Sequence, residues 1–156
     1  MPNYFFDSSA LVKLYHPEMG TSKVEALFRT PDNRIIISRL TIVELESALS
    51  TKVRTGAISP DEKNHASTKI LQHGRDRVFR VVAVRESHFS DAKKLIVRYG
   101  VQNSLRTLDA IQLSVALDLH QRALVDFIVS ADQTLAAVAR AEGLPAIDPL
   151  TPPTAP

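Results

Sequence analysis

Short apolar runs alternate along the chain with longer segments in which apolar residues recur every three or four positions. The short runs are rich in β-branched and aromatic residues and predict buried strands, whereas the longer segments predict amphipathic helices. Strands are expected at residues 3–6, 34–38, 77–84, 126–130 and 146–147. Helices are expected to begin near residues 10, 21, 41, 60, 87, 107 and 132.

Because helices separate the strands, the strands are expected to pair in parallel, with helices on both faces of the sheet. The pattern therefore predicts an α/β protein, a three-layer α/β/α sandwich around a mostly parallel sheet of four to five strands. A chain of 156 residues fits one domain, which we place at residues 1–149. Residues 150–156 are expected to form a disordered tail.

The composition is that of a soluble globular protein, with 44% apolar and 23% charged residues. The chain has no cysteine, which excludes disulfides, thiolate metal sites and a cysteine nucleophile. No apolar run is long enough to cross a membrane, and the N-terminus lacks the basic region of a signal peptide. We therefore expect a cytoplasmic protein with no membrane partner.

The net charge of +2 is unevenly distributed, because residues 63–98 contain nine Lys or Arg residues and only three acidic residues. A basic segment of this kind suits a polyanionic substrate. A solvated basic helix face explains it equally well, so both interpretations remain open.

Four acidic residues stand where the chain turns from a strand into a helix. Asp7 and Asp132 follow predicted strands, while Glu44 and Asp109 lie in the first turns of predicted helices. In a parallel sheet such turns meet at one edge. Carboxylates that close together repel each other unless a cation neutralises them, so the arrangement predicts a site for a divalent metal ion.

Three of these acidic residues also have a purely structural interpretation. Asp7 could cap the following helix, although Ser8 and Ser9 are available for that role. Glu44 could close a capping box with Thr41. On the residues alone, this interpretation of Glu44 and a role in the site are equally supported.

Asp109 could simply favour the positive end of the helix dipole. Ser130, two residues before Asp132, could donate a hydrogen bond in the site or hold a metal-bound water. Glu46 and Asp118 should point elsewhere on their helices, and Asp126 should lie at the opposite end of the sheet. The five histidines show no metal-ligand spacing, and no glycine-rich phosphate loop is present.

Four segments together resemble PIN-domain ribonucleases, and most closely the VapC toxins of bacterial toxin–antitoxin pairs. They are FFDSSALVKLY (5–15), LTIVELESAL (40–49), RTLDAIQLSVAL (106–117) and FIVSADQTLAAVARAEGLPAIDP (127–149). No single segment is decisive, but their order and context are specific. The resemblance covers residues 3–149.

The resemblance implies that Asp7, Glu44, Asp109 and Asp132 are catalytic and hold Mg²⁺ or Mn²⁺. It implies metal-dependent hydrolysis of RNA, inhibition by a cognate antitoxin, and a homodimer. Arg106 is the first residue of one of the matching segments and could contact phosphates, or be ordinary surface charge. The same two interpretations apply to Lys13.

Other classes of protein also place an aspartate after the first strand. A haloacid-dehalogenase-type phosphatase needs a second acid where this chain has Ser9, and a receiver domain needs an aspartate where it has Arg85 and Glu86. A PIN-like RNA-binding module without toxicity is a further alternative. Leucines of the early helices could serve a dimer or antitoxin surface, although core packing explains most of them better: Leu11, Leu14, Leu27, Leu45 and Leu49.

Overall fold

A single parallel sheet forms the centre of the protein. The structure is a computed structural model that describes residues 1–151. The strands are β1 (Asn3–Phe6), β2 (Arg34–Ser38), β3 (Arg80–Val82), β4 (Phe127–Val129) and β5 (Ala146–Ile147). Their order across the sheet is β3-β2-β1-β4-β5, and every pair is parallel.

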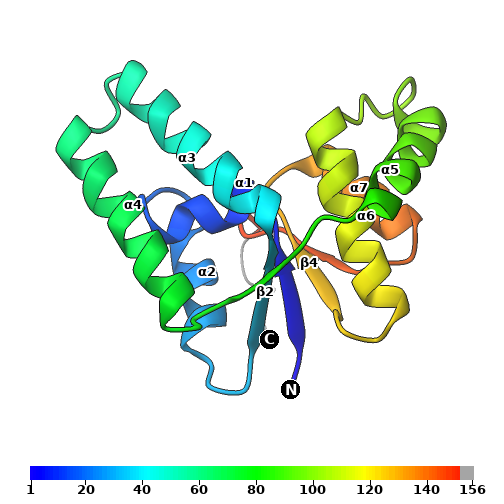
Figure 1. Ribbon diagram of the computed structural model, residues 1–156, viewed down its shortest axis with the longest axis horizontal. Coiled ribbons are helices and arrows are strands. Elements are labelled where there is room, and N and C mark those ends of the chain that lie inside the picture. Colours follow the sequence, from blue (N-terminus) through cyan, green and yellow to red (C-terminus); the bar gives the residue numbers. More distant parts are fainter. Residues whose placement is uncertain (152–156) are drawn as a thin grey trace.

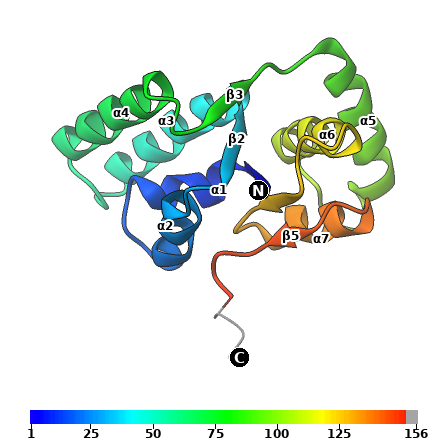
Figure 2. The ribbon, with the colours of Figure 1, turned by 90° about the horizontal axis from the view of Figure 1, so that it is seen from below.

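Helices cover both faces of this sheet (Figures 1 and 2). They are α1 (Ser8–Leu11), the 3₁₀ turn η1 (Val12–Leu14), α2 (Thr21–Arg29), α3 (Arg39–Arg54), α4 (Pro60–Arg75), α5 (Glu86–Tyr99), α6 (Thr107–Gln121) and α7 (Gln133–Ala141). The helices α1 to α4 pack on one face, and α5 to α7 pack on the other. The predicted three-layer α/β/α fold is therefore confirmed.

Alternate residues of the strands enter two separate hydrophobic cores. Phe5 of β1 packs with α5, α6 and α7, while Tyr4 and Phe6 pack with α1 to α4. In β2, Ile36 joins the first core and its neighbours on either side join the second. This follows from the two-residue period of a strand, and burying both faces explains why these strands are almost wholly apolar.

The leucines that could have formed a partner surface belong to the second core instead. Leu11, Leu45 and Leu49 are fully buried within the chain, and Leu14 and Leu27 are partly buried against the same cluster. Within residues 1–151, no helix is both long and apolar enough to span a membrane. Of the predicted tail, residues 152–156 lie outside the described residues.

The bounds of several elements differ from the sequence prediction. The third strand is limited to Arg80–Val82, because the chain enters it through Arg77, which has a left-handed φ of 55°, and β2 ends opposite Val82. The first helix gives way to a 3₁₀ turn after Leu11. The fifth helix begins at Glu86, and the backbone N–H of Arg85 donates to Nδ1 of a histidine, His88.

The fourth helix shows the predicted capping box, with Ser59 Oγ accepting from the Glu62 amide and Glu62 accepting from the Ser59 amide.

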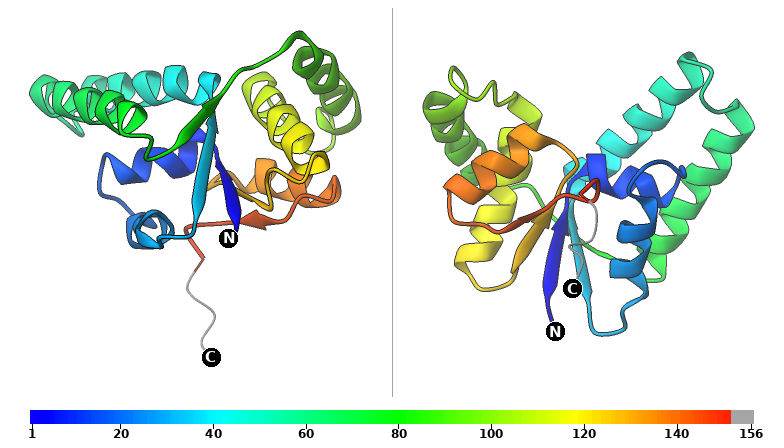
Figure 3. Two further views of the ribbon diagram at one scale, coloured as in Figure 1. Left: turned by 60° about the horizontal axis from the view of Figure 1, so that its bottom comes forward. Right: turned by 180° about the vertical axis from the view of Figure 1, so that it is seen from behind.

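The parallel register of the strands determines where the candidate site lies. Phe6 pairs with Val129, and the amide of Asp7 donates to the carbonyl of Val129 at 3.2 Å. Because α1 and α3 both begin at this carboxyl edge (Figures 1 and 3), residues distant in sequence meet there.

Candidate active site

The four predicted acidic residues line one cleft at the carboxyl edge of the sheet. The cleft has a volume of about 660 Å³ and lies between α3 and the first turn of α6, with Leu40, Val43 and Leu108 among its apolar lining. Asp7 follows β1, Glu44 lies in the second turn of α3, Asp109 lies in the first turn of α6, and Asp132 precedes α7. The structure thus brings all four together as the sequence predicted.

Asp7 is the most buried of the four, with only 3% of its surface exposed. Its carboxylate accepts hydrogen bonds from Ser9 Oγ at 2.8 Å, from Ser130 Oγ at 2.8 Å and from the Ala10 amide at 3.1 Å. The last bond makes Asp7 itself the N-cap of α1. The interpretation that Ser8 or Ser9 would cap this helix is therefore wrong, because Ser9 instead orients the Asp7 carboxylate.

Burial raises the pKa of Asp7 from 3.8 to about 7. Its three hydrogen bonds oppose the shift, and the nearby charge of Glu44 adds to it. A carboxylate that is costly to ionise in the metal-free protein gains most from a nearby cation.

Glu44 does not form the capping box with Thr41 that competed with its role in the site. The helix begins at Arg39, two residues earlier than expected, and Ser38 caps it by accepting from the Thr41 amide at 3.2 Å. Glu44 therefore lies a full turn inside the helix and faces the cleft. The pKa of Glu44 is raised overall. Burial raises it most, hydrogen bonds from Gln112 and Ser8 lower it, and the charge of Asp109 raises it.

Asp109 and Asp132 share one partner, the guanidinium of Arg106. The Nε of Arg106 lies 2.9 Å from Asp109 Oδ2, and its Nη2 lies 3.2 Å from Asp132 Oδ2. Asp132 also caps α7 by accepting from the Leu135 amide at 2.9 Å. The pKa of Asp109 is raised overall. Burial raises it most, the hydrogen bond and charge of Arg106 lower it, and the charge of Asp132 raises it.

The four carboxylates interact pairwise across the cleft. Asp7 is affected by the charge of Glu44, Glu44 by that of Asp109, and Asp109 by that of Asp132. An all-oxygen set of this kind suits Mg²⁺ or Mn²⁺. As the side chains stand in residues 1–151, no three acidic or histidine residues are arranged to hold a metal ion. Hydrogen bonds and the Arg106 ion pairs hold their oxygens instead.

Sequence reasoning missed Gln112, which connects α6 to α3. Its side chain is buried, donates to Glu44 Oε2 at 2.5 Å and to Thr41 Oγ1 at 2.8 Å, and accepts from Ser38 Oγ at 2.7 Å. One signal was available: Gln112 follows Asp109 by three residues, on the same helix face, within an otherwise apolar stretch.

The rival acidic residues lie elsewhere, as predicted. Glu46 pairs with Lys63, Asp118 with His88, and Asp126 accepts from the Asn3 amide at the opposite edge of the sheet.

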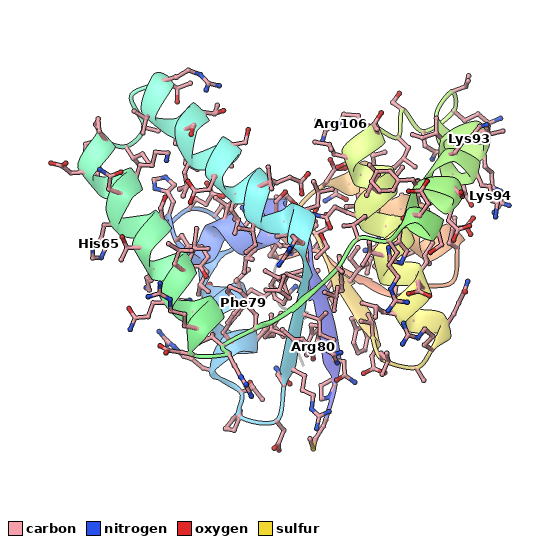
Figure 4. All side chains as sticks on the ribbon, in the orientation of Figure 1. His65, Phe79, Arg80, Lys93, Lys94 and Arg106 are labelled. Atoms are coloured by element: carbon pink, nitrogen blue, oxygen red, sulfur yellow. The ribbon has the colours of Figure 1, made fainter. Side chains whose placement is uncertain are left out.

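Neither interpretation of Lys13, a phosphate contact or ordinary surface charge, is correct. Its ammonium is buried and lies 2.9 Å from Glu18, so it does not reach the cleft. Arg106 does line the cleft, and Figure 4 shows it at the start of α6, across from α3.

A profile of the PIN domain family matches residues 4–141. The chain therefore belongs to the PIN domain family, as its four motifs had indicated. A search of the curated proteins finds no match.

Solved structures share the fold at low sequence identity. The protein PAE2754 from Pyrobaculum aerophilum is 22% identical, with a TM-score of 0.60 over 93% of this chain and 83% of that one. Mycobacterium tuberculosis VapC20, described as a sarcin-ricin loop cleaving toxin, is 15% identical, with a TM-score of 0.66 over 86% and 93%. Rickettsia felis VapBC2, solved bound to a DNA fragment from its promoter, is 17% identical, with a TM-score of 0.61 over 94% and 98%.

Proposed function

We propose that the protein is an endoribonuclease that hydrolyses RNA phosphodiester bonds with Mg²⁺ or Mn²⁺. The observation that carries this proposal is the convergence of Asp7, Glu44, Asp109 and Asp132 on one cleft. Membership of the PIN domain family supports it. In this proposal, all four residues are catalytic and hold the metal.

The metal would supply an activated water and stabilise the oxygen that leaves. The chain's own residues orient the carboxylates that would hold it. Ser9 and Ser130 fix the Asp7 carboxylate, and Gln112 fixes that of Glu44. Such buried partners limit the rotation of a ligand and help set its geometry.

The haloacid-dehalogenase-type phosphatase is the less supported alternative. That mechanism needs an acid at the position of Ser9, whose hydroxyl here donates to Asp7. A PIN-like RNA-binding module that does not cleave has the same fold and the same cleft, so only activity separates it from the nuclease.

We further propose that the protein is the toxin of a toxin–antitoxin pair, that it binds a cognate antitoxin, and that it acts as a homodimer. Support comes from similar folds described as a toxin and as a VapBC assembly.

The decisive experiment measures cleavage of a mixed RNA pool by purified protein. Cleavage is expected with Mg²⁺ or Mn²⁺ and is expected to stop with EDTA. The Asp7→Asn variant should lose at least about 100-fold in rate, because several kcal/mol of transition-state stabilisation go with the metal site. Glu44→Gln should behave similarly.

Two matched variants serve as controls. Asp91→Asn neutralises an exposed helical aspartate, and Glu46→Gln changes the neighbouring glutamate of α3, which pairs with Lys63. Both should cleave at the wild-type rate, and circular dichroism should show that all variants are folded. Full cleavage by Asp7→Asn, or cleavage in metal-free buffer, would contradict the mechanism.

A further inference from the structure

Arg106 is the only cationic side chain among the described residues that line the cleft. It immediately precedes α6, and 74% of its side chain is exposed. Its guanidinium nevertheless contacts two acidic residues that lie far apart in the sequence, through two different nitrogens. Its charge also acts on Glu44, so it influences three of the four candidate ligands.

Arg106 binds one oxygen of each of two candidate metal ligands. It contacts Oδ2 of Asp109 and Oδ2 of Asp132 at 2.9 and 3.2 Å. The other oxygen of Asp132, Oδ1, already accepts a hydrogen bond from the Leu135 amide in the first turn of α7. A metal ion and the guanidinium therefore compete for the same two carboxylates.

Arg106 can leave these oxygens at low cost. Ion pairs of an exposed arginine contribute little stability, because water solvates the free guanidinium well. The side chain is long and is not held in the core. A guanidinium released at the rim of the cleft is suited to a phosphate group, which it can bind through two parallel N–H donors.

We propose that Arg106 is a replaceable cation: it holds Asp109 and Asp132 together in the metal-free protein, and it moves to an RNA phosphate when the metal binds. This inference rests on the proposed function of the same cleft. It gives Arg106 two successive partners, the carboxylates and then the substrate.

Two opposite effects of Arg106→Ala are expected. Calorimetric titration with Mn²⁺, without RNA, should show about 3- to 10-fold tighter binding than in the wild type, because no ion pair must be broken. With saturating Mn²⁺, kcat/KM for RNA cleavage should fall about 10- to 100-fold, because a charged hydrogen bond to phosphate is lost. A purely structural arginine would not strengthen one step and weaken the other.

The release of Arg106 can be observed directly by NMR. In the metal-free protein the Arg106 Nε–H signal, identified by its absence in Arg106→Lys, should be protected from exchange. Saturating Mg²⁺ should move this signal to the position of a solvated arginine. Arg122→Ala is the control, because Arg122 pairs with Asp118 at the other end of the same helix and should leave metal affinity unchanged.

The failures can be told apart. If the wild type binds neither Mn²⁺ nor Mg²⁺, both the proposed function and this inference are wrong. If the wild type binds metal and cleaves RNA, but Arg106→Ala binds Mn²⁺ no more tightly, only the inference about Arg106 is overturned. An Nε–H signal that stays protected at saturating Mg²⁺ overturns it as well.

Discussion

At the scale of single residues, Asp7 combines a structural role with the chemical role that we propose for it. It caps α1 through the Ala10 amide while its carboxylate faces the cleft. The two roles are compatible because a carboxylate has two oxygens, and Ser9 and Ser130 complete its hydrogen bonding. From the sequence, capping the helix and lying in the site were alternatives for Asp7. In the structure Asp7 does both.

The raised pKa of Asp7 predicts how stability depends on pH in the metal-free protein. Between 3.8 and about 7 the folded state holds a proton on Asp7 that the unfolded chain has released. The free energy of unfolding should therefore decrease as pH rises through this range, by up to about 4 kcal/mol from Asp7.

Urea denaturation with EDTA at several pH values tests this, with Asp7→Asn as the comparison. Because asparagine does not titrate, the variant should lose less stability between the two ends of the range. Glu44 and Asp109 titrate in both proteins, so most of the difference between them comes from Asp7. Equal pH dependence in the two proteins would show that Asp7 is not the group responsible.

At the scale of elements, the sequence predicted which helices and strands exist better than where they begin. The helix was expected to begin near Thr41, but Ser38 caps it, so α3 begins at Arg39, two residues earlier. Ser38 is the cap because β2 passes directly into the helix. That shift removed the capping box and placed Glu44 in the cleft.

The role of Gln112 could not be predicted from the sequence for a different reason. Its role depends on α6 lying close to the start of α3 at the cleft, which no local pattern encodes. Its amide forms hydrogen bonds with Ser38, Thr41 and Glu44 at the same time.

Replacing Gln112 with leucine should therefore destabilise the protein by about 1–3 kcal/mol, since buried polar groups lose their partner. It should also reduce RNA cleavage, because Glu44 is no longer held. Gln121→Leu makes the same change at an exposed position of the same helix and should leave both properties unchanged. Chemical denaturation and the cleavage assay would check this, and a fully stable, active Gln112→Leu would refute the role of the amide.

At the scale of the whole molecule, the parallel topology accounts for how much of the site the sequence could predict. Once strands and helices alternate, the residues after β1 and β4 must meet at one edge, so the positions of Asp7 and Asp132 follow from order alone. The side-chain partners depend on packing between helices and could not be read in advance. Glu18 is an example, because it pairs with Lys13 and also with Lys52 of α3.

An RNA-binding module with the same fold differs from a nuclease in how much protein is needed for each RNA molecule affected. A nuclease acts on many RNA molecules in turn, whereas a binding module must be as abundant as its target. We therefore expect that low-level expression of the wild-type chain in bacteria arrests growth, while equal amounts of soluble Asp7→Asn do not.

Glu46→Gln should be as toxic as the wild type, because it leaves the cleft intact. Growth curves with quantified soluble protein give the measurement. If Asp7→Asn arrests growth as strongly, the effect comes from binding rather than from cleavage. If abundant soluble wild-type protein is harmless although it cleaves RNA in vitro, the protein is a ribonuclease but not a toxin in that host.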